Sequence, residues 1–174
     1  VEDFFSAEAF RSVETRSAKI VTSIAMFYDL EDPIAFARQV EEILDDNGVW
    51  HFEQSYMPSM LRTNSYDTIC HEHLEFYSLG VVKRILSEAN LKVVDVQMNA
   101  INGGSFAVTA CKNTALYPSN LPVINWLLKQ EEEMALETLQ PYEEFQRRVF
   151  RHRNNLRELI EALVADGKKI IGYG

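Results

Sequence analysis

Short continuous apolar runs alternate along the chain with apolar positions spaced three or four residues apart. The continuous runs at residues 18–27 and 49–56 are rich in β-branched or aromatic side chains and are too short for long helices, so they predict buried strands. Between them, Asp32 and Pro33 provide the N-cap and first-turn proline of a helix that we expect Gly48 to end. The predicted apolar face of this helix comprises Ile34, Ala37, Val40, Ile43 and Leu44.

Serines precede two further helical patterns. Ser6 is placed to cap a short helix over residues 6–13, and Ser78 is placed to cap a longer helix after it. The apolar face of the second helix comprises Val81, Val82, Ile85, Leu86 and Ala89.

Two more strand patterns, residues 91–100 and 105–112, are joined through Asn102-Gly103-Gly104. An Asn-Gly sequence favours a hairpin turn, so this pair is predicted to be antiparallel. The strands at residues 18–27 and 49–54 are connected by a helix and are predicted to be parallel neighbours. The predicted fold class is therefore α/β, with a mostly parallel sheet and an antiparallel edge hairpin.

From Ser119 onward the chain is rich in helix formers, with an interruption at Pro141 and a helix end at Gly167. The closing "KKIIGYG" predicts a further strand. We therefore expect a sheet domain over residues 1–116, a helical connector over residues 117–168, and the first strand of a second α/β lobe at residues 169–174. Both ends resemble cut ends, because "VEDFFS" is typical of the end of a strand.

Composition narrows the possible functions. A formal net charge of −9 argues against a general nucleic-acid binder, which needs a basic face. The two cysteines, Cys70 and Cys111, form no CxxC pair, so neither a disulfide framework nor a structural zinc site is expected, and a reducing, cytoplasmic compartment is. No apolar run approaches the roughly 20 residues of a membrane span, so no membrane partner is expected.

The stretch "YDTICHEHLEFYS", residues 66–78, has three possible interpretations. In an extended segment His71 and His73 would share one face and could bind a metal, but no third ligand has a recognisable spacing. The segment could instead be a solvated or capping cluster before the helix. In the third interpretation an imidazole acts as a general base near neutral pH, and the adjacent Glu72 orients it.

Two other segments have both a structural and a functional interpretation, and a third has only a structural one. Residues 3–5 (Asp-Phe-Phe) could pack in the core or line a cofactor crevice. Gly172-Tyr173-Gly174 lies where a strand should turn into a helix, which is where α/β folds bind phosphates. The acidic run Glu131-Glu132-Glu133 is most simply a solvated helix face.

In this order, the stretches "DFFS", "YDTICHEHLEFYSL", "VVDVQMNAINGGSFAV" and "GKKIIGYG" resemble the S-adenosylmethionine-dependent sugar C-methyltransferases of deoxysugar pathways. The resemblance runs over the whole chain. It implies a class I methyltransferase sheet and a second α/β lobe. It also implies a zinc-binding module and a glycine-rich cofactor loop upstream of Val1, so that the chain is an internal fragment.

The resemblance also implies a reaction and its residues. A 4-keto nucleotide sugar loses the proton beside its ketone, and the enolate attacks the methyl group of S-adenosylmethionine. His73 matches the family's base and Glu72 its companion carboxylate. Cys70, Asp29 and Asn102 stand where the family typically has tyrosine, histidine and histidine. The implied cofactor-binding residues are Asp3, Phe4, Phe5, Ser23 and Met26, and the implied substrate-binding residues are Cys70, Asn102, Gly103, Ser105, Gly172, Tyr173 and Gly174.

The residues leave two alternatives open. A methyltransferase of the same architecture could act on another small substrate. Alternatively, an α/β domain of this kind could be a non-catalytic binding or scaffold domain, since the three departures from the family pattern affect its functional positions.

Overall fold

A computed structural model describes residues 4–173. The chain divides between Met134 and Ala135 into two compact units. Helix α5 (Leu121–Glu133), which we expected in a helical connector, belongs to the first unit. It does so because its side chains Ile124 and Leu127 are buried in the hydrophobic core of that unit.

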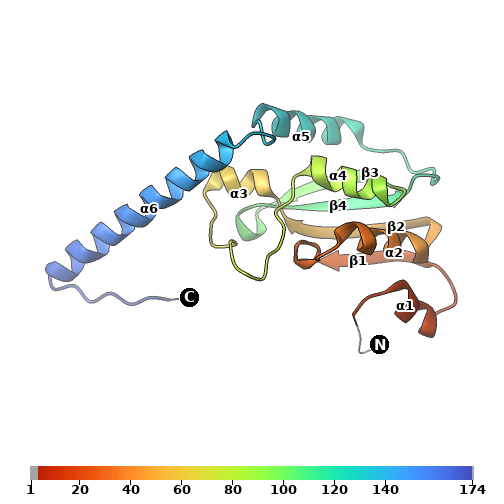
Figure 1. The fold of residues 1–174 in the computed structure, drawn as a ribbon, viewed down its shortest axis with the longest axis horizontal. Helices are drawn as coiled ribbons and strands as arrows, with labels where there is room; N and C mark the ends of the chain where they lie inside the picture. Colours follow the sequence, from red (N-terminus) through yellow and green to blue (C-terminus); the bar gives the residue numbers. More distant parts are fainter. Residues whose placement is uncertain (1–3, 174) are drawn as a thin grey trace. The chain divides into compact units, whose positions relative to one another are not determined.

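The core of the first unit is a four-stranded mixed sheet with the order β1-β2-β4-β3 (Figure 1). β1 and β2 are parallel, and β4 is antiparallel to both of its neighbours. This confirms the predicted parallel pair and the antiparallel hairpin at one edge, and it means that three strands run in one direction. The strands are β1 (Ala18–Ile24), β2 (Leu44–Ser55), β3 (Leu91–Asn99) and β4 (Ser105–Lys112).

Two helices, α2 (Pro33–Ile43) and α4 (Leu79–Glu88), lie side by side over one face of the sheet (Figure 1). Each begins at the predicted cap: the Asp32 side chain accepts a hydrogen bond from the Ala35 amide, and the Ser78 hydroxyl accepts one from the Val81 amide. Their apolar faces and the strand side chains below form one core. Its members include Val40, Ile85, Leu86, Trp50, Phe52 and Phe106.

The prediction that Gly48 ends the helix is wrong. Helix α2 ends at Ile43, and β2 begins at the next residue. The register between β1 and β2 jumps from Ala18–Leu44 to Ile20–Val49, so that Gly48 lies inside an irregularity of the strand. A Cβ atom on Gly48 would lie 2.7 Å from the Ala18 carbonyl oxygen. Glycine is needed here for close approach of two backbones.

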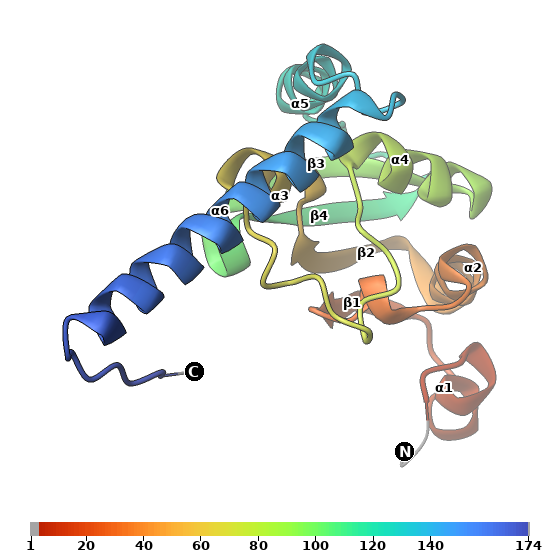
Figure 2. The same cartoon turned by 60° about the vertical axis from the view of Figure 1, so that its left-hand side comes forward.

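Two short helices complete the first unit. Helix α1 (Ala7–Val13) begins at Ser6, as predicted, with the Ser6 hydroxyl accepting a hydrogen bond from the Ala9 amide. Helix α3 (Met57–Thr63) follows β2 and was not predicted. The long connection from α3 to α4 passes the ends of the strands (Figure 2).

The second unit contains helix α6 (Gln140–Ala165), with Pro141 in its first turn. It ends before Gly167, whose φ of +74° suits glycine. Residues 168–173 have no regular secondary structure, and Gly174 lies outside the described residues. A strand forms only against a partner strand, so the predicted second lobe stays a prediction. Of the helices described over residues 4–173, none is both long enough and apolar enough to cross a membrane.

Candidate active site

Most of the predicted site residues in the first unit lie at one end of the sheet. The last residue of β3, Asn99, pairs with Ser105, and Ser105 pairs with Ser55 at the end of β2. The Ala25 amide, just after β1, donates to the Glu53 carbonyl at 2.8 Å. The carboxyl ends of β1, β2 and β3 therefore meet where β4 begins. Crevices at such carboxyl ends are where α/β folds bind their ligands.

Residues 57–78, which we call the HEHL segment, form a loop closed at its base. Tyr56 and Tyr77 form an isolated parallel bridge, and the Met57 amide donates to the Tyr77 carbonyl at 2.9 Å. Farther out, the amides of Leu74 and Glu75 both donate to the Tyr28 carbonyl, at 3.1 and 3.0 Å. The segment is thereby attached to the chain that follows β1 (Figure 2).

His73 is the half-buried histidine of the HEHL segment, whereas His71 and Glu72 are exposed. Its Nδ1 lies 2.8 Å from the Thr68 carbonyl oxygen. A carbonyl only accepts hydrogen bonds, so Nδ1 must carry the proton. In the neutral ring Nε2 then has a free lone pair, which is the arrangement that a general base requires.

Tyr28 was not singled out from the sequence, yet it lies near His73, Asp29 and Cys70. It belongs to the 3-10 helix η1 (Phe27–Asp29), and its ring centroid is 4.4 Å from that of His73. Burial raises the pKa of Tyr28, and the charges of Asp29 and Cys70 raise it further. The phenol therefore stays neutral, and it supplies one wall for the imidazole. No local motif marks this residue, because only the fold brings it to His73.

Two of the predicted cofactor-binding residues, Phe4 and Phe5, have exposed side chains. The ring of Phe5 is 38% exposed and packs 5.0 Å from Phe36, in α2. Phe4 is also exposed, whereas Asp3 lies outside the described residues. Exposed rings beside the start of α2 fit a flat aromatic ligand such as adenine.

Ser23 is the second-last residue of β1, and Met26 follows two residues after the strand ends. The Ser23 hydroxyl is buried and accepts a hydrogen bond from the Trp50 indole at 2.9 Å. The Ser23 side chain therefore packs in the core. Met26 is half-buried and directly precedes η1.

The predicted substrate residues of the hairpin turn adopt strained or left-handed backbone conformations. Asn102 and Gly103 have φ of +51° and +79°, and a Cβ atom on Gly103 would overlap the hydroxyl of Ser65. The Ser105 hydroxyl is buried and donates to the Ile101 carbonyl at 3.0 Å. The turn therefore packs closely against the HEHL segment, and Asn102 remains exposed beside it.

The prediction that residues 131–133 form a solvated face is wrong for Glu131. This side chain is 7% exposed, and its Oε1 accepts hydrogen bonds from the Tyr56 hydroxyl at 2.7 Å and the Leu79 amide at 2.6 Å. Its Oε2 accepts from the Gly80 amide at 2.9 Å. The run looked solvated because the partners lie far away in sequence. Burial raises the pKa of Tyr56 above its usual value, and the bond to Glu131 raises it further.

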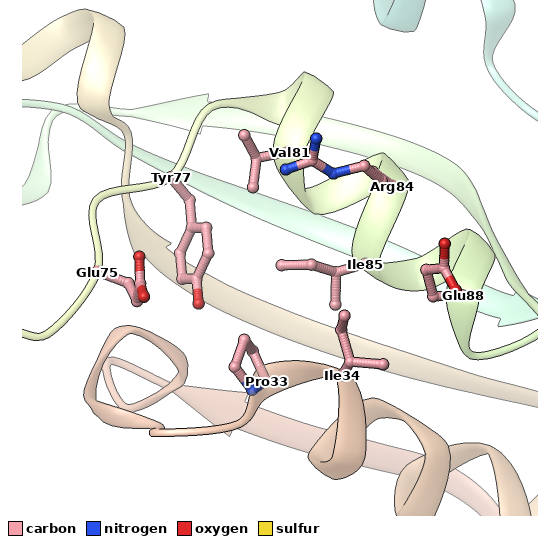
Figure 3. Close-up of a pocket in the computed structure, with 8 residues that line it drawn as sticks. All are labelled: Pro33, Ile34, Glu75, Tyr77, Val81, Arg84, Ile85 and Glu88. Carbon is pink, nitrogen blue, oxygen red and sulfur yellow. The ribbon is translucent and has the colours of Figure 1, made fainter.

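A pocket of about 270 Å³ lies between the start of α2 and one side of α4 (Figure 3). Tyr77 points into this region, but its hydroxyl is buried and has no hydrogen-bond partner among residues 4–173. Burial raises the pKa of Tyr77. The lining residues are Pro33, Ile34, Glu75, Tyr77, Val81, Arg84, Ile85 and Glu88.

Two predicted sites remain, namely the phosphate-binding glycines near the end of the chain and the possible metal site at His71 and His73. Gly172 and Tyr173 are exposed in the irregular end of the second unit. Across the described residues, no group of three or more histidine, cysteine, aspartate or glutamate side chains is arranged to hold a metal ion. His71 and His73 therefore find no further metal ligand in the part of the chain that the structure describes.

Comparison with known families gives two matches that together span nearly the whole chain. Residues 2–96 match the family described as "Methyltransferase domain". Residues 100–174 match the family described as "C-methyltransferase C-terminal domain". The first match includes β1, β2 and the HEHL segment, and the second includes the hairpin turn and everything after it.

Among curated proteins, the chain is similar to C-methyltransferase NovU of Streptomyces niveus. The two are 33% identical over 172 residues, which is 98% of this chain and 41% of NovU. The chain thus spans about two fifths of the length of this relative.

Solved structures of methyltransferases are also similar. The O-methyltransferase NcsB1 from neocarzinostatin biosynthesis, in complex with S-adenosylmethionine, is 17% identical with a TM-score of 0.43, over 56% of this chain and 29% of that one. Magnesium protoporphyrin IX methyltransferase ChlM from Synechocystis is 9% identical with a TM-score of 0.44, over 56% and 46%. Because these scores are below 0.5, family membership follows from the sequence matches.

Proposed function

Because this chain belongs to the methyltransferase family, we propose that the protein transfers a methyl group to a carbon atom of a small molecule. Carbon as the acceptor is supported by the match of residues 100–174 and by the similarity to NovU. The family uses S-adenosylmethionine, which when bound supplies an electrophilic methyl group. In this chain Phe4, Phe5 and the backbone around Ser23 and Met26 would contact it.

The single observation that carries the proposal is the contact between Nδ1 of His73 and the Thr68 carbonyl, which fixes the position of the ring proton. The carbon beside a ketone becomes a strong nucleophile once it loses a proton and forms an enolate, so methylation of that carbon needs a base beside the acceptor. The Thr68 carbonyl holds the proton of His73 on Nδ1 and leaves Nε2 as the base. His73 takes the proton from the carbon beside a ketone, and the electrons of the broken C–H bond move into the enolate. The enolate carbon would then bond to the methyl group while the bond between that group and the sulfonium sulfur breaks, and the electrons of the broken bond would stay on the sulfur of the departing S-adenosylhomocysteine.

The neighbours of His73 have supporting roles in this proposal. Glu72 directly precedes His73 in the sequence, and in this proposal its negative charge would stabilise the imidazolium formed after proton transfer. The Tyr28 ring packs against His73, and Cys70 is near enough to raise the pKa of Tyr28, so in this proposal both would line the acceptor site. His71 has no assigned role, since the motif does not distinguish it from a structural histidine.

We assign the acceptor to the 4-keto nucleotide sugars. The turn residues Asn102, Gly103 and Ser105 would bind the sugar ring, and Gly172, Tyr173 and Gly174 would approach the diphosphate. Glycines permit such an approach because they carry no Cβ atom. This assignment is supported by the sequence motifs that carry the resemblance and by the need of enolate chemistry for a ketone.

The decisive experiment measures proton exchange without methyl transfer. The full-length protein is incubated with a 4-keto nucleotide sugar in deuterated buffer, and deuterium at the carbon beside the ketone is followed by NMR. His73→Ala should slow the exchange by about 10²- to 10⁴-fold, since that is the usual contribution of a general base. His71→Ala, two residues away and exposed, is the matched control and should cost much less.

Affinity for S-adenosylhomocysteine, measured by calorimetry, should be the same in both variants and the wild type. Exchange in His73→Ala at the wild-type rate would show that another group is the base. If no keto sugar exchanges with the wild-type protein, the assignment of the acceptor fails.

A further inference from the structure

One buried carboxylate holds both ends of the HEHL segment. Glu131 accepts a hydrogen bond from the Tyr56 hydroxyl, at the residue before the segment begins. The same side chain accepts hydrogen bonds from the amides of Leu79 and Gly80, directly after the segment ends. The three donor–acceptor distances lie between 2.6 and 2.9 Å, and the side chain of Glu131 comes from α5, which is separate from both anchors.

The chemistry of this contact makes it strong. The two amides belong to the first turn of α4, where unpaired N–H groups and the helix dipole favour a negative charge. Hydrogen bonds to a carboxylate are shorter and about twice as strong as bonds between neutral groups. The contact is also tight, because a Cβ atom on Gly80 would lie only 3.2 Å from Oε2 of Glu131. Glycine at this position lets the carboxylate reach the helix.

Helix capping alone would need only the two amides. The bond to Tyr56 adds the opposite end of the segment, so that one carboxylate closes a loop of residues 57–78 at its base. Within that loop, Nδ1 of His73 lies 2.8 Å from the Thr68 carbonyl oxygen, and the amides of Leu74 and Glu75, directly after His73, donate to the Tyr28 carbonyl. The orientation of the imidazole therefore depends on a base that Glu131 holds together.

We propose that Glu131 is a positioning residue for the reaction, acting through the HEHL segment on His73. This inference rests on the proposed function of His73. It concerns a residue that contacts neither His73 nor the substrate, and whose effect passes through the two ends of one loop.

The test compares Glu131→Gln with Glu132→Gln in the full-length protein. Both remove one negative charge from α5, but Glu132 is exposed. In Glu131→Gln an amide N–H₂ replaces one carboxylate oxygen and faces a backbone or hydroxyl donor, so at least one of the three bonds is lost. A milder second variant, Tyr56→Phe, removes only the bond at the start of the segment and keeps the cap of α4.

Two measurements separate positioning from general stabilisation. Hydrogen–deuterium exchange, read by mass spectrometry, should become faster in peptides covering residues 57–80 and stay unchanged in peptides covering β1 and α2. The kcat for methyl transfer should fall about 10- to 100-fold, because a misplaced catalytic group costs about that much, while KM for S-adenosylmethionine stays unchanged. Tyr56→Phe should show the same pattern to a smaller degree, and Glu132→Gln should match the wild type.

The outcomes separate this inference from the function on which it rests. Wild-type kcat in Glu131→Gln, in an active protein, would overturn the inference and leave the role of His73 intact. Faster exchange spread over the whole first unit would show that Glu131 only stabilises the fold, and it would also overturn the inference. If the wild-type protein transfers no methyl group, the proposed function fails. Exchange in residues 57–80 then decides whether Glu131 holds the segment.

Discussion

Two buried tyrosines offer a matched test of how the fold around the HEHL segment is stabilised. Tyr56 and Tyr77 are each 3% exposed and face each other in an isolated bridge. The Tyr56 hydroxyl donates to Glu131, whereas the Tyr77 hydroxyl has no partner among the described residues. Replacing either by phenylalanine removes one oxygen atom and leaves the ring in place. The difference in free energy of unfolding between the two variants therefore measures the contribution of the Tyr56–Glu131 hydrogen bond.

The structure sets the expected magnitudes. Tyr56→Phe removes a hydrogen bond to a charged group and should lower the free energy of unfolding by about 1.5–3 kcal/mol. Tyr77→Phe removes a hydroxyl whose burial without a partner costs about 1–3 kcal/mol, so its free energy of unfolding should be unchanged or higher. Equilibrium unfolding in urea, at pH 7 and matched protein concentration, measures both changes.

The loss of stability at alkaline pH gives a second test of Tyr56 and Tyr77. Burial raises the pKa of both phenols above the usual value of 10.0, so the folded protein favours their neutral forms. Their contribution to stability is complete below about pH 10, where the unfolded chain begins to ionise, and it is lost as the pH rises further. Tyr77→Phe removes one such group, so its stability should fall less steeply above pH 10 than that of the wild type.

The reasoning would be refuted if Tyr77→Phe destabilised the protein as much as Tyr56→Phe does. In that case the Tyr77 hydroxyl would have to be bonded in solution. If Tyr77→Phe and the wild type lost stability identically above pH 10, folding would not raise the pKa of Tyr77, and the argument from its burial would be wrong.

Two further predictions concern other buried or strained positions. Gly103→Ala should lower the free energy of unfolding by about 1–3 kcal/mol, because φ is +79° and the new Cβ atom would overlap Ser65. Gly172 has open space around it, so Gly172→Ala should change the free energy of unfolding by less than about 0.5 kcal/mol. Thermal melts of both variants measure the two changes, and equal effects would contradict the strain argument. Gln54→Met should raise stability by about 1 kcal/mol in urea, since both amide atoms of Gln54 are buried without a partner among residues 4–173. Exposed Gln97→Met is the control, and a large loss in Gln54→Met would show that the amide is bonded.

Elements whose formation depends on neighbouring residues could be predicted from the sequence. Ser6, Asp32 and Ser78 begin helices where their side chains were predicted to cap them. The parallel pair β1–β2 and the hairpin β3–β4 followed from the helix between the first two strands and the Asn-Gly turn between the last two. Caps and turns bond within about four residues, so a short stretch of sequence contains all of their partners. The place of the HEHL motif just before the Ser78-capped helix was predictable for the same reason, whereas α3, between β2 and the motif, was not predicted.

Tertiary structure alone decided what several of these residues do. Gly48 was expected to end a helix, but it serves a close approach to Ala18 in the neighbouring strand. Glu131 was expected in water, but it bonds to Leu79, 52 residues earlier in the chain. Tyr28 carries no motif, yet its ring packs against His73. In each case the deciding partner lies 30 or more residues away in the sequence and is brought close only by the fold. A pattern read over a few residues shows which groups are polar or small, but the energy of burying them depends on partners that only the folded chain supplies.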